Sequence, residues 1–178
     1  MVVLQCTGMS TRSGLASGRL TVMTPAVLIL ENANVEHELR SYDHDPTTES
    51  YGTEAAEALG LDSATVFKTL LAVVDRSETV VAVVPVTRRL DLKALARAAG
   101  AKKAVMAEPS DAERLTGYVV GGISPLGQRR RLRTFIDESA ESQEHVYVSA
   151  GRRGLEVKLT PAVLTQLLSA RFSPIATG

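Results

Sequence analysis

The sequence is poor in cysteine and in aromatic residues. Cys6 is its one cysteine, so the chain can form no internal disulfide and no multi-cysteine metal site, which fits a cytoplasmic protein without a metal or other cofactor. Aromatic residues make up 4% and tryptophan is absent, which argues against the stacked-base surface of single-strand binders. No apolar run approaches the roughly 18 residues that a membrane span requires, so we expect no membrane partner.

Charge is balanced in total but unevenly distributed. The 178 residues are 44% hydrophobic and 22% charged, as expected of one globular domain, and the formal net charge is +0. Residues 31–62 hold nine acids and one arginine, whereas residues 88–133 hold eleven bases and four acids. This asymmetry indicates either solvated faces of opposite sign or a basic face that binds a polyanion.

The chain divides into an appendage and one domain. Residues 1–22 lack periodicity and the apolar block of a secretory signal, so we interpret them as an appendage to a domain spanning 23–178. Thr24 and Pro25 suit a helix N-cap and first helical position. Caps and apolar periodicity predict helices at 25–31, 53–59, 91–99, 110–115 and 161–169 and strands at 37–42, 65–74, 79–84, 104–106, 133–137, 145–149 and 155–159. Strands neighbour one another too often for repeated βαβ units, so the fold class is mixed α+β.

Lys68 is the one charged residue in the predicted strand at 65–74. The strand is apolar on both faces, which is typical of burial on both sides, and it should pair antiparallel with the next strand across a short turn. Lys68 and its neighbour Thr69 therefore either lie at a ligand-binding cleft or the lysine extends from the strand's end into solvent.

Two glycine-bearing loops are the other candidates for a site. In residues 117–128, Gly121, Gly122 and Gly127 surround Ser124 and Pro125, which allows backbone N–H groups to approach a ligand closely, although a tight bend at a sheet corner would use the same residues. No Gly-Lys-Ser/Thr follows, so this is not a nucleotide loop of the common kind. Residues 149–155 form a second loop, which a tight hairpin largely explains.

The arginine run follows the first loop directly. Arg129, Arg130 and Arg131 are predicted to hold the phosphate backbone of a nucleic acid, with a charged strand edge as the alternative.

Several segments together resemble one family. Residues 42–46, 66–70, 90–93, 100–103, 117–128 and 149–155 have the order and spacing of the YbaK/EbsC family, with Gly-Gly-Ile-Ser-Pro-Leu-Gly-Gln as the most specific match. The resemblance covers Met23 to about Ile175. It implies a mixed, mostly antiparallel curved sheet with flanking helices, the fold of the editing domain inserted in bacterial prolyl-tRNA synthetases. Members of the family clear tRNA that carries the wrong amino acid.

The resemblance also implies roles for individual residues. The expected catalytic residues are Lys68, Gly121 and Ser149. The expected substrate-binding residues are Tyr42, Tyr51, Thr69, Gly122, Ile123, Ser124, Pro125 and Gly151. Glu156 stands where a family member has aspartate, and Ser50-Tyr51-Gly52 replaces an Asn-aromatic-Gly, so these positions depart from the family pattern.

An aminoacyl-tRNA ester is already activated, so its cleavage needs orientation, stabilisation of an oxyanion and a nucleophile. Gly-x-Ser-x-Gly is absent, which gives no sign of a serine nucleophile. The resemblance implies that the substrate's own cysteine thiol attacks, in a trans-editing deacylase acting on Cys-tRNA(Pro) and also Cys-tRNA(Cys). Aminoacyl-tRNA and prolyl-tRNA synthetase are the expected partners. The alternatives are an editor of another small residue, such as alanine on tRNA(Pro), and a binding module for tRNA or synthetase without catalysis.

Overall fold

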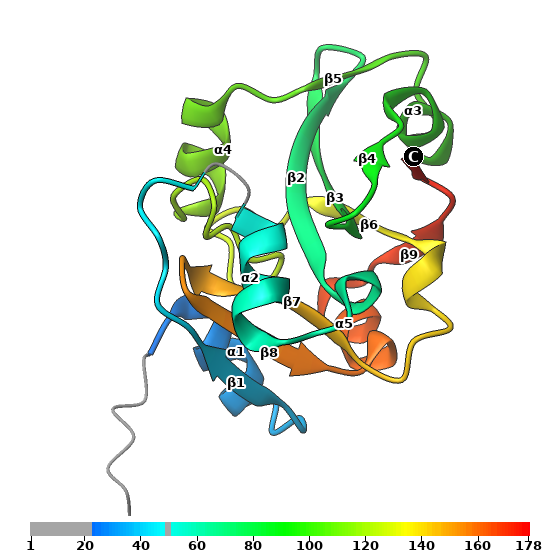
Figure 1. Ribbon diagram of the computed structural model, residues 1–178. Coiled ribbons are helices and arrows are strands. Elements are labelled where there is room, and N and C mark those ends of the chain that lie inside the picture. The colour runs from blue at the N-terminus through cyan, green and yellow to red at the C-terminus, as the bar shows by residue number, and fades with distance from the viewer. Residues whose placement is uncertain (1–22, 49–50) are drawn as a thin grey trace, which may run out of the picture.

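The computed structural model describes residues 23–48 and 51–178, so the predicted appendage lies outside the described residues (Figure 1). The helices are α1 (Pro25–Asn32), α2 (Tyr51–Leu59), α3 (Leu92–Ala99), α4 (Pro109–Thr116) and α5 (Pro161–Leu168). The strands are β1 (Glu38–Ser41), β2 (Phe67–Val74), β3 (Glu78–Pro85), β4 (Arg89–Leu90), β5 (Ala104–Met106), β6 (Arg133–Asp137), β7 (Val146–Arg152), β8 (Leu155–Leu159), β9 (Arg171–Ser173) and β10 (Ala176–Thr177).

The strands form two main sheets. The larger has the order β5-β2-β3-β6-β9, in which β2 pairs antiparallel with β3 and β5, while β3 with β6 and β6 with β9 are parallel. The smaller has the order β1-β8-β7 and is antiparallel, and β4 pairs with β10. The mixed, mostly antiparallel α+β class predicted from the sequence is therefore confirmed.

The side chains of strand β2 pack into two apolar cores. In Figure 1 the strand runs through the middle of the molecule. Phe67 and Leu71 pack into the core that includes α1, β7 and β8, whereas Ala72 and Val74 pack into the core covered by α3. Side chains of a strand alternate between its faces, so burial of both sets confirms a strand covered on both sides.

Element boundaries differ from the prediction in a few places. The predicted strand at 65–74 begins only at Phe67, because Asp62 caps a 3-10 turn at Ser63–Thr65. Helix α2 begins at Tyr51, two residues before the predicted start at Thr53, so Thr53 lies inside the helix and does not cap it. Strands β4, β9 and β10 were not predicted, since each is short and acquires its partner only through the tertiary fold.

A cap identified in the sequence, Thr24, fixes helix α1 against strand β7. Thr24 Oγ1 accepts a hydrogen bond from Val27 N–H at 3.2 Å and donates one to Ala150 O at 2.5 Å. The N-cap of α1 is thereby tied to strand β7. The start of α1 thus contacts both glycine loops, through Ala150 in one and Gly127 in the other.

Candidate active site

A cavity of about 450 Å³ opens beside the first half of β2. Its volume lies in the range of small-molecule sites. Strand β2, helix α2, the start of α4, the loop after α4 and the second sheet contribute its walls. The lining residues are Tyr51, Gly52, Thr53, Val66, Phe67, Lys68, Thr69, Leu70, Leu71, Val86, Met106, Ala107, Pro109, Ala112, Val120, Gly121, Ile123, Ser149 and Glu156. The predicted site residues among them are Tyr51, Lys68, Thr69, Gly121, Ile123 and Ser149.

Lys68 lies at this cavity and is only partly buried. Its Nζ donates to Val86 O at 3.4 Å, and no carboxylate of a described residue forms a salt bridge with it. Burial, and to a lesser extent the charge of Arg89, lowers the pKa of Lys68 below its usual value of 10.5. A lysine without an acidic partner can bind an anionic or carbonyl oxygen of a ligand.

Thr69 and Ser149, which are both predicted site residues, also line the cavity. Thr69 Oγ1 is buried and has no hydrogen-bond partner among the described residues. Ser149 Oγ accepts a bond from Gly151 N–H at 3.4 Å. None of the three histidines is among the lining residues, so no imidazole lies in the cavity to activate Ser149 as a nucleophile.

Glycines allow the loop after α4 to pack against three other elements. Gly121 has φ +86°, and a Cβ on it would lie 2.8 Å from the Tyr51 ring. A Cβ on Gly122 would lie 2.8 Å from Arg153 N in the β7–β8 hairpin, and one on Gly127 would lie 2.5 Å from the backbone of Pro25 in α1. These contacts leave no room for a side chain, so close packing explains Gly122 and Gly127 without a ligand.

Several residues expected to bind substrate lie outside the cavity wall. Ser124 is fully buried, where its Oγ accepts from Leu126 N–H at 3.2 Å, and Pro125 is buried beside it. Gly151 has φ +97° and faces the Tyr118 ring. With Gly122, these residues are not among those lining the cavity, so their contact with substrate stays a prediction.

Glu156 lines the cavity from strand β8, next to Tyr42. Burial raises the pKa of Glu156 to about 8, so its carboxyl is mainly protonated at neutral pH and can donate a hydrogen bond. Burial and the charges of Glu156 and Glu54 raise the pKa of Tyr42 to about 12, and Tyr42 itself does not line the cavity. Ser50, the other departure from the family pattern, lies outside the described residues.

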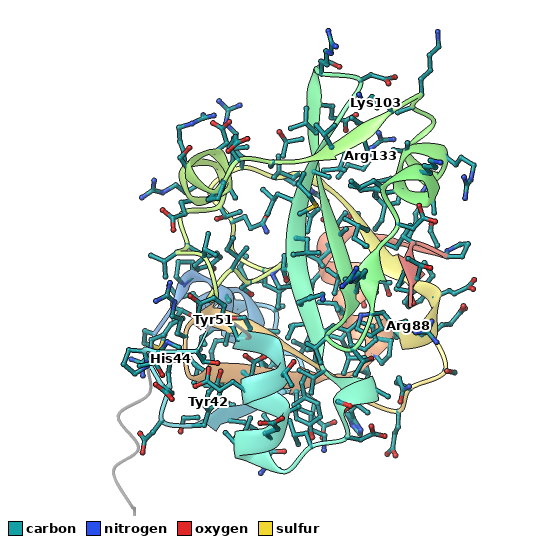
Figure 2. All side chains as sticks on the ribbon, turned by 45° about the horizontal axis from the view of Figure 1, so that its top comes forward. Tyr42, His44, Tyr51, Arg88, Lys103 and Arg133 are labelled. Atoms are coloured by element: carbon teal, nitrogen blue, oxygen red, sulfur yellow. The ribbon has the colours of Figure 1, made fainter. Side chains whose placement is uncertain are left out.

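Sequence reasoning missed the contacts that hold Tyr51. Figure 2 shows His44 beside Tyr51, with their ring centroids 5.6 Å apart. His44 Nδ1 lies 2.9 Å from a carboxylate oxygen of Glu54 in α2, and the Arg153 guanidinium lies 4.8 Å from the centroid of the Tyr51 ring. Arg153 and His44 both lie in segments that matched the family, but only the tertiary structure brings them to Tyr51.

The three arginines expected to bind a nucleic-acid backbone are exposed and do not line the cavity. The main-chain N–H groups of Arg129 and Arg130 bind the last carbonyls of α4, and Arg131 donates to Ser169 Oγ at 2.7 Å. Among the described residues no cluster of three or more His, Cys, Asp or Glu has metal-binding geometry. In the same part of the chain no helix is long and apolar enough to cross a membrane.

Comparison with known proteins identifies the family. The family model of the aminoacyl-tRNA editing domain matches residues 45–167, which include the whole cavity wall. The chain belongs to the aminoacyl-tRNA editing domain family. The editing domain is 41% identical over 122 residues to a protein of Enterococcus faecalis provisionally named Cys-tRNA(Pro)/Cys-tRNA(Cys) deacylase EbsC, an alignment that covers 68% of this chain and 74% of the relative.

Solved structures share the fold of this editing domain. A provisionally assigned trans-editing enzyme for prolyl tRNA synthetase has a TM-score of 0.74 at 24% identity, covering 88% of this chain and 99% of that one. A scaffold protein used to present linear epitopes by computational design has a TM-score of 0.76 at 22% identity, covering 86% and 96%. At such identities the likeness shows the fold alone.

Proposed function

We propose that this editing domain is a trans-editing deacylase that removes cysteine from mischarged tRNA(Pro) and from Cys-tRNA(Cys). The observation that carries the proposal is the cavity that both Lys68 and Gly121 line, in which no described residue is an activated nucleophile. The name of the 41% identical relative supports the same substrates. The substrate's aminoacyl ester is the group to be cleaved, and the cavity is large enough for an aminoacyl group with part of its terminal ribose.

The proposed chemistry uses the thiol of the bound cysteinyl group. The sulfur attacks the ester carbonyl, a carbon–sulfur bond forms, the carbon–oxygen bond to the ribose breaks, and the thiol proton ends on the ribose hydroxyl. The products are free tRNA and a cyclic thioester, which water later opens to cysteine. The protein contributes orientation, together with Lys68 Nζ and Gly121 N–H as donors to oxygens that gain charge in the transition state.

The proposal also covers the domain boundaries, the cellular location and the protein partner of the enzyme. Residues 23–178 act as the editing domain, and residues 1–22 are an appendage that catalysis does not require. The cytoplasm is the proposed location, and prolyl-tRNA synthetase the proposed protein partner, since it produces the mischarged tRNA. Removal of residues 1–22 should leave the turnover of Cys-tRNA(Pro) within about twofold of the full chain, a change too small to mark a lost catalytic group.

Single-turnover hydrolysis of Cys-, Ala- and Pro-tRNA(Pro) tests the function. We expect rapid release of cysteine and much slower release of alanine and proline, which lack a thiol. Faster release of alanine would favour an alanine editor, since the cavity is also large enough for an alanyl group. Binding of tRNA without release of any amino acid would favour a binding module. Either result would contradict the proposal.

A further inference from the structure

Arg153 binds the one carbonyl group whose direction sets the direction of Gly121 N–H. Its Nε lies 2.9 Å and its terminal amine 2.7 Å from Val120 O, a two-pronged, charge-assisted contact. The same guanidinium lies 4.8 Å from the centroid of the Tyr51 ring. Arg153 is exposed on the β7–β8 hairpin and does not line the cavity.

The peptide between Val120 and Gly121 is planar, so its C=O and N–H point in opposite directions. The Val120 carbonyl points to a guanidinium outside the cavity wall, and the Gly121 N–H therefore points away from that guanidinium. Gly121 itself lines the cavity. No described residue accepts a hydrogen bond from Gly121 N–H, so this donor is available to a ligand.

Because residue 121 is glycine, the Val120–Gly121 peptide can rotate easily, and the Gly121 N–H would then point elsewhere. Glycine tolerates positive and negative φ about equally, so rotation of the Val120–Gly121 peptide by half a turn meets little backbone resistance at this position. The preceding peptide has its own anchor, because Glu113 Oε1 accepts from Val120 N–H at 2.9 Å. Val119 O likewise accepts from Gly122 N–H at 2.9 Å. Arg153 alone among the described side chains holds the peptide that carries the Gly121 donor.

We propose that Arg153 is a positioning residue for deacylation, which keeps the Val120–Gly121 peptide in the orientation that presents Gly121 N–H to the ester oxygen. This inference rests on the proposed function. Arg153 does not contact the substrate in this proposal. Its guanidinium packs against the Tyr51 ring, which holds it in place.

The test compares Arg153→Met, Arg153→Lys and the matched control Arg152→Met, which removes a neighbouring exposed arginine of the same hairpin. We expect Arg153→Met to lower kcat for Cys-tRNA(Pro) about ten- to hundredfold, somewhat less than complete loss of an oxyanion donor. KM should stay within about twofold, because the donor acts mainly in the transition state. Arg153→Lys should recover part of kcat with a single charged donor, and Arg152→Met should match the wild type.

A crystal structure of Arg153→Met supplies a second readout that does not depend on turnover. We expect the Val120 carbonyl to leave its wild-type direction or to occupy two orientations, with the rest of the cavity unchanged. An unaltered carbonyl, or a kcat of Arg153→Met within twofold of the wild type, overturns the inference. If wild-type protein releases no amino acid, the proposed function fails, and the direction of the carbonyl in the variant still decides whether Arg153 orients this peptide.

Discussion

Lys68 and Glu156 line the same cavity from two different sheets. Lys68 belongs to β2 of the five-stranded sheet and Glu156 to β8 of the three-stranded sheet, and no salt bridge joins them in the described part of the chain. Burial lowers the pKa of Lys68 and raises that of Glu156 to about 8. With Glu156 protonated at neutral pH, no carboxylate of a described residue is paired with the ammonium of Lys68, which can then bind oxygens of a substrate.

The raised pKa of Glu156 predicts how stability depends on pH. The folded protein binds this proton more tightly than the unfolded chain, in which the pKa is near its ordinary 4.5. The stabilisation is therefore complete below about pH 4.5 and is lost as the pH rises through about 8. Glu156→Gln keeps the shape of the protonated carboxyl and does not titrate. Urea unfolding between pH 5 and 9 should show the wild type losing stability relative to this variant, with exposed Glu144→Gln as the control. If the unfolding free energies of the wild type and Glu156→Gln changed in parallel with pH, Glu156 would not be a buried, protonated carboxyl.

Gly121→Ala should reduce deacylation strongly. The new Cβ would meet the Tyr51 ring, and φ +86° is unfavourable for alanine, so the loop that carries the N–H donor must shift. Gly60→Ala is the matched control, because Gly60 has φ +63° but no atom within 4 Å of the place that an alanine Cβ would take. It should lose about 1 kcal/mol of unfolding free energy and keep its activity. Equal turnover by the two variants would contradict a role for the position of this loop in deacylation.

Substrate-assisted chemistry predicts that the substrate's side chain controls the rate. Ser-tRNA(Pro) offers a hydroxyl in place of the thiol and should react at least about tenfold more slowly than Cys-tRNA(Pro), since a hydroxyl is far less ionised near neutral pH. Cys6→Ser should change neither rate. Single-turnover rates measured on both substrates decide the matter, and similar rates would point to an activated water molecule as nucleophile.

The exposed arginines after the glycine loop remain a predicted tRNA contact. Replacing Arg129, Arg130 and Arg131 with alanine should weaken tRNA binding and flatten the slope of log affinity against log salt by up to about two units. Turnover at saturating tRNA should hardly change, because these contacts act equally in the ground and transition states. The same change of charge at Lys93, Lys102 and Lys103 is the control; Lys103 lies far from Tyr51 in Figure 2. A flattened slope in the control alone would place the phosphate contacts at that end of the molecule.

The fold was largely predictable because its signals are local. Thr24 caps α1 as predicted, the predicted helices at 91–99 and 161–169 match α3 and α5 to within a residue, and the apolar alternation around Lys68 marks a strand covered on both faces. The strands β9 and β10 were missed, since each acquires its partner only through the tertiary fold. Parallel pairing of β6 with β3 likewise depends on a long crossover that leaves no local pattern.

The site was predictable in part. Lys68, Thr69, Gly121 and Ser149 lie together as the motifs indicate. Motifs do not tell a residue that lines a cavity from one that supports it, and Ser124 belongs to the supporting kind because it is buried against its own loop. The role of the Glu156 carboxyl depends on its burial, and that of the Arg153 guanidinium on the direction of the Val120 carbonyl. Neither can be read from the sequence.

Deacylation of Cys-tRNA(Pro) by Lys68→Ala tests the central claim most directly, with melting temperature measured on the same sample. Lys158→Ala is the matched control, a partly buried lysine of β8 outside the cavity. The account predicts that Lys68→Ala loses at least about a hundredfold in rate and keeps a melting temperature close to that of the wild type, while Lys158→Ala keeps its rate. A folded Lys68→Ala protein that releases cysteine within about threefold of the wild-type rate would contradict the account, because so small a loss is not that of an electrostatic donor at the reacting ester.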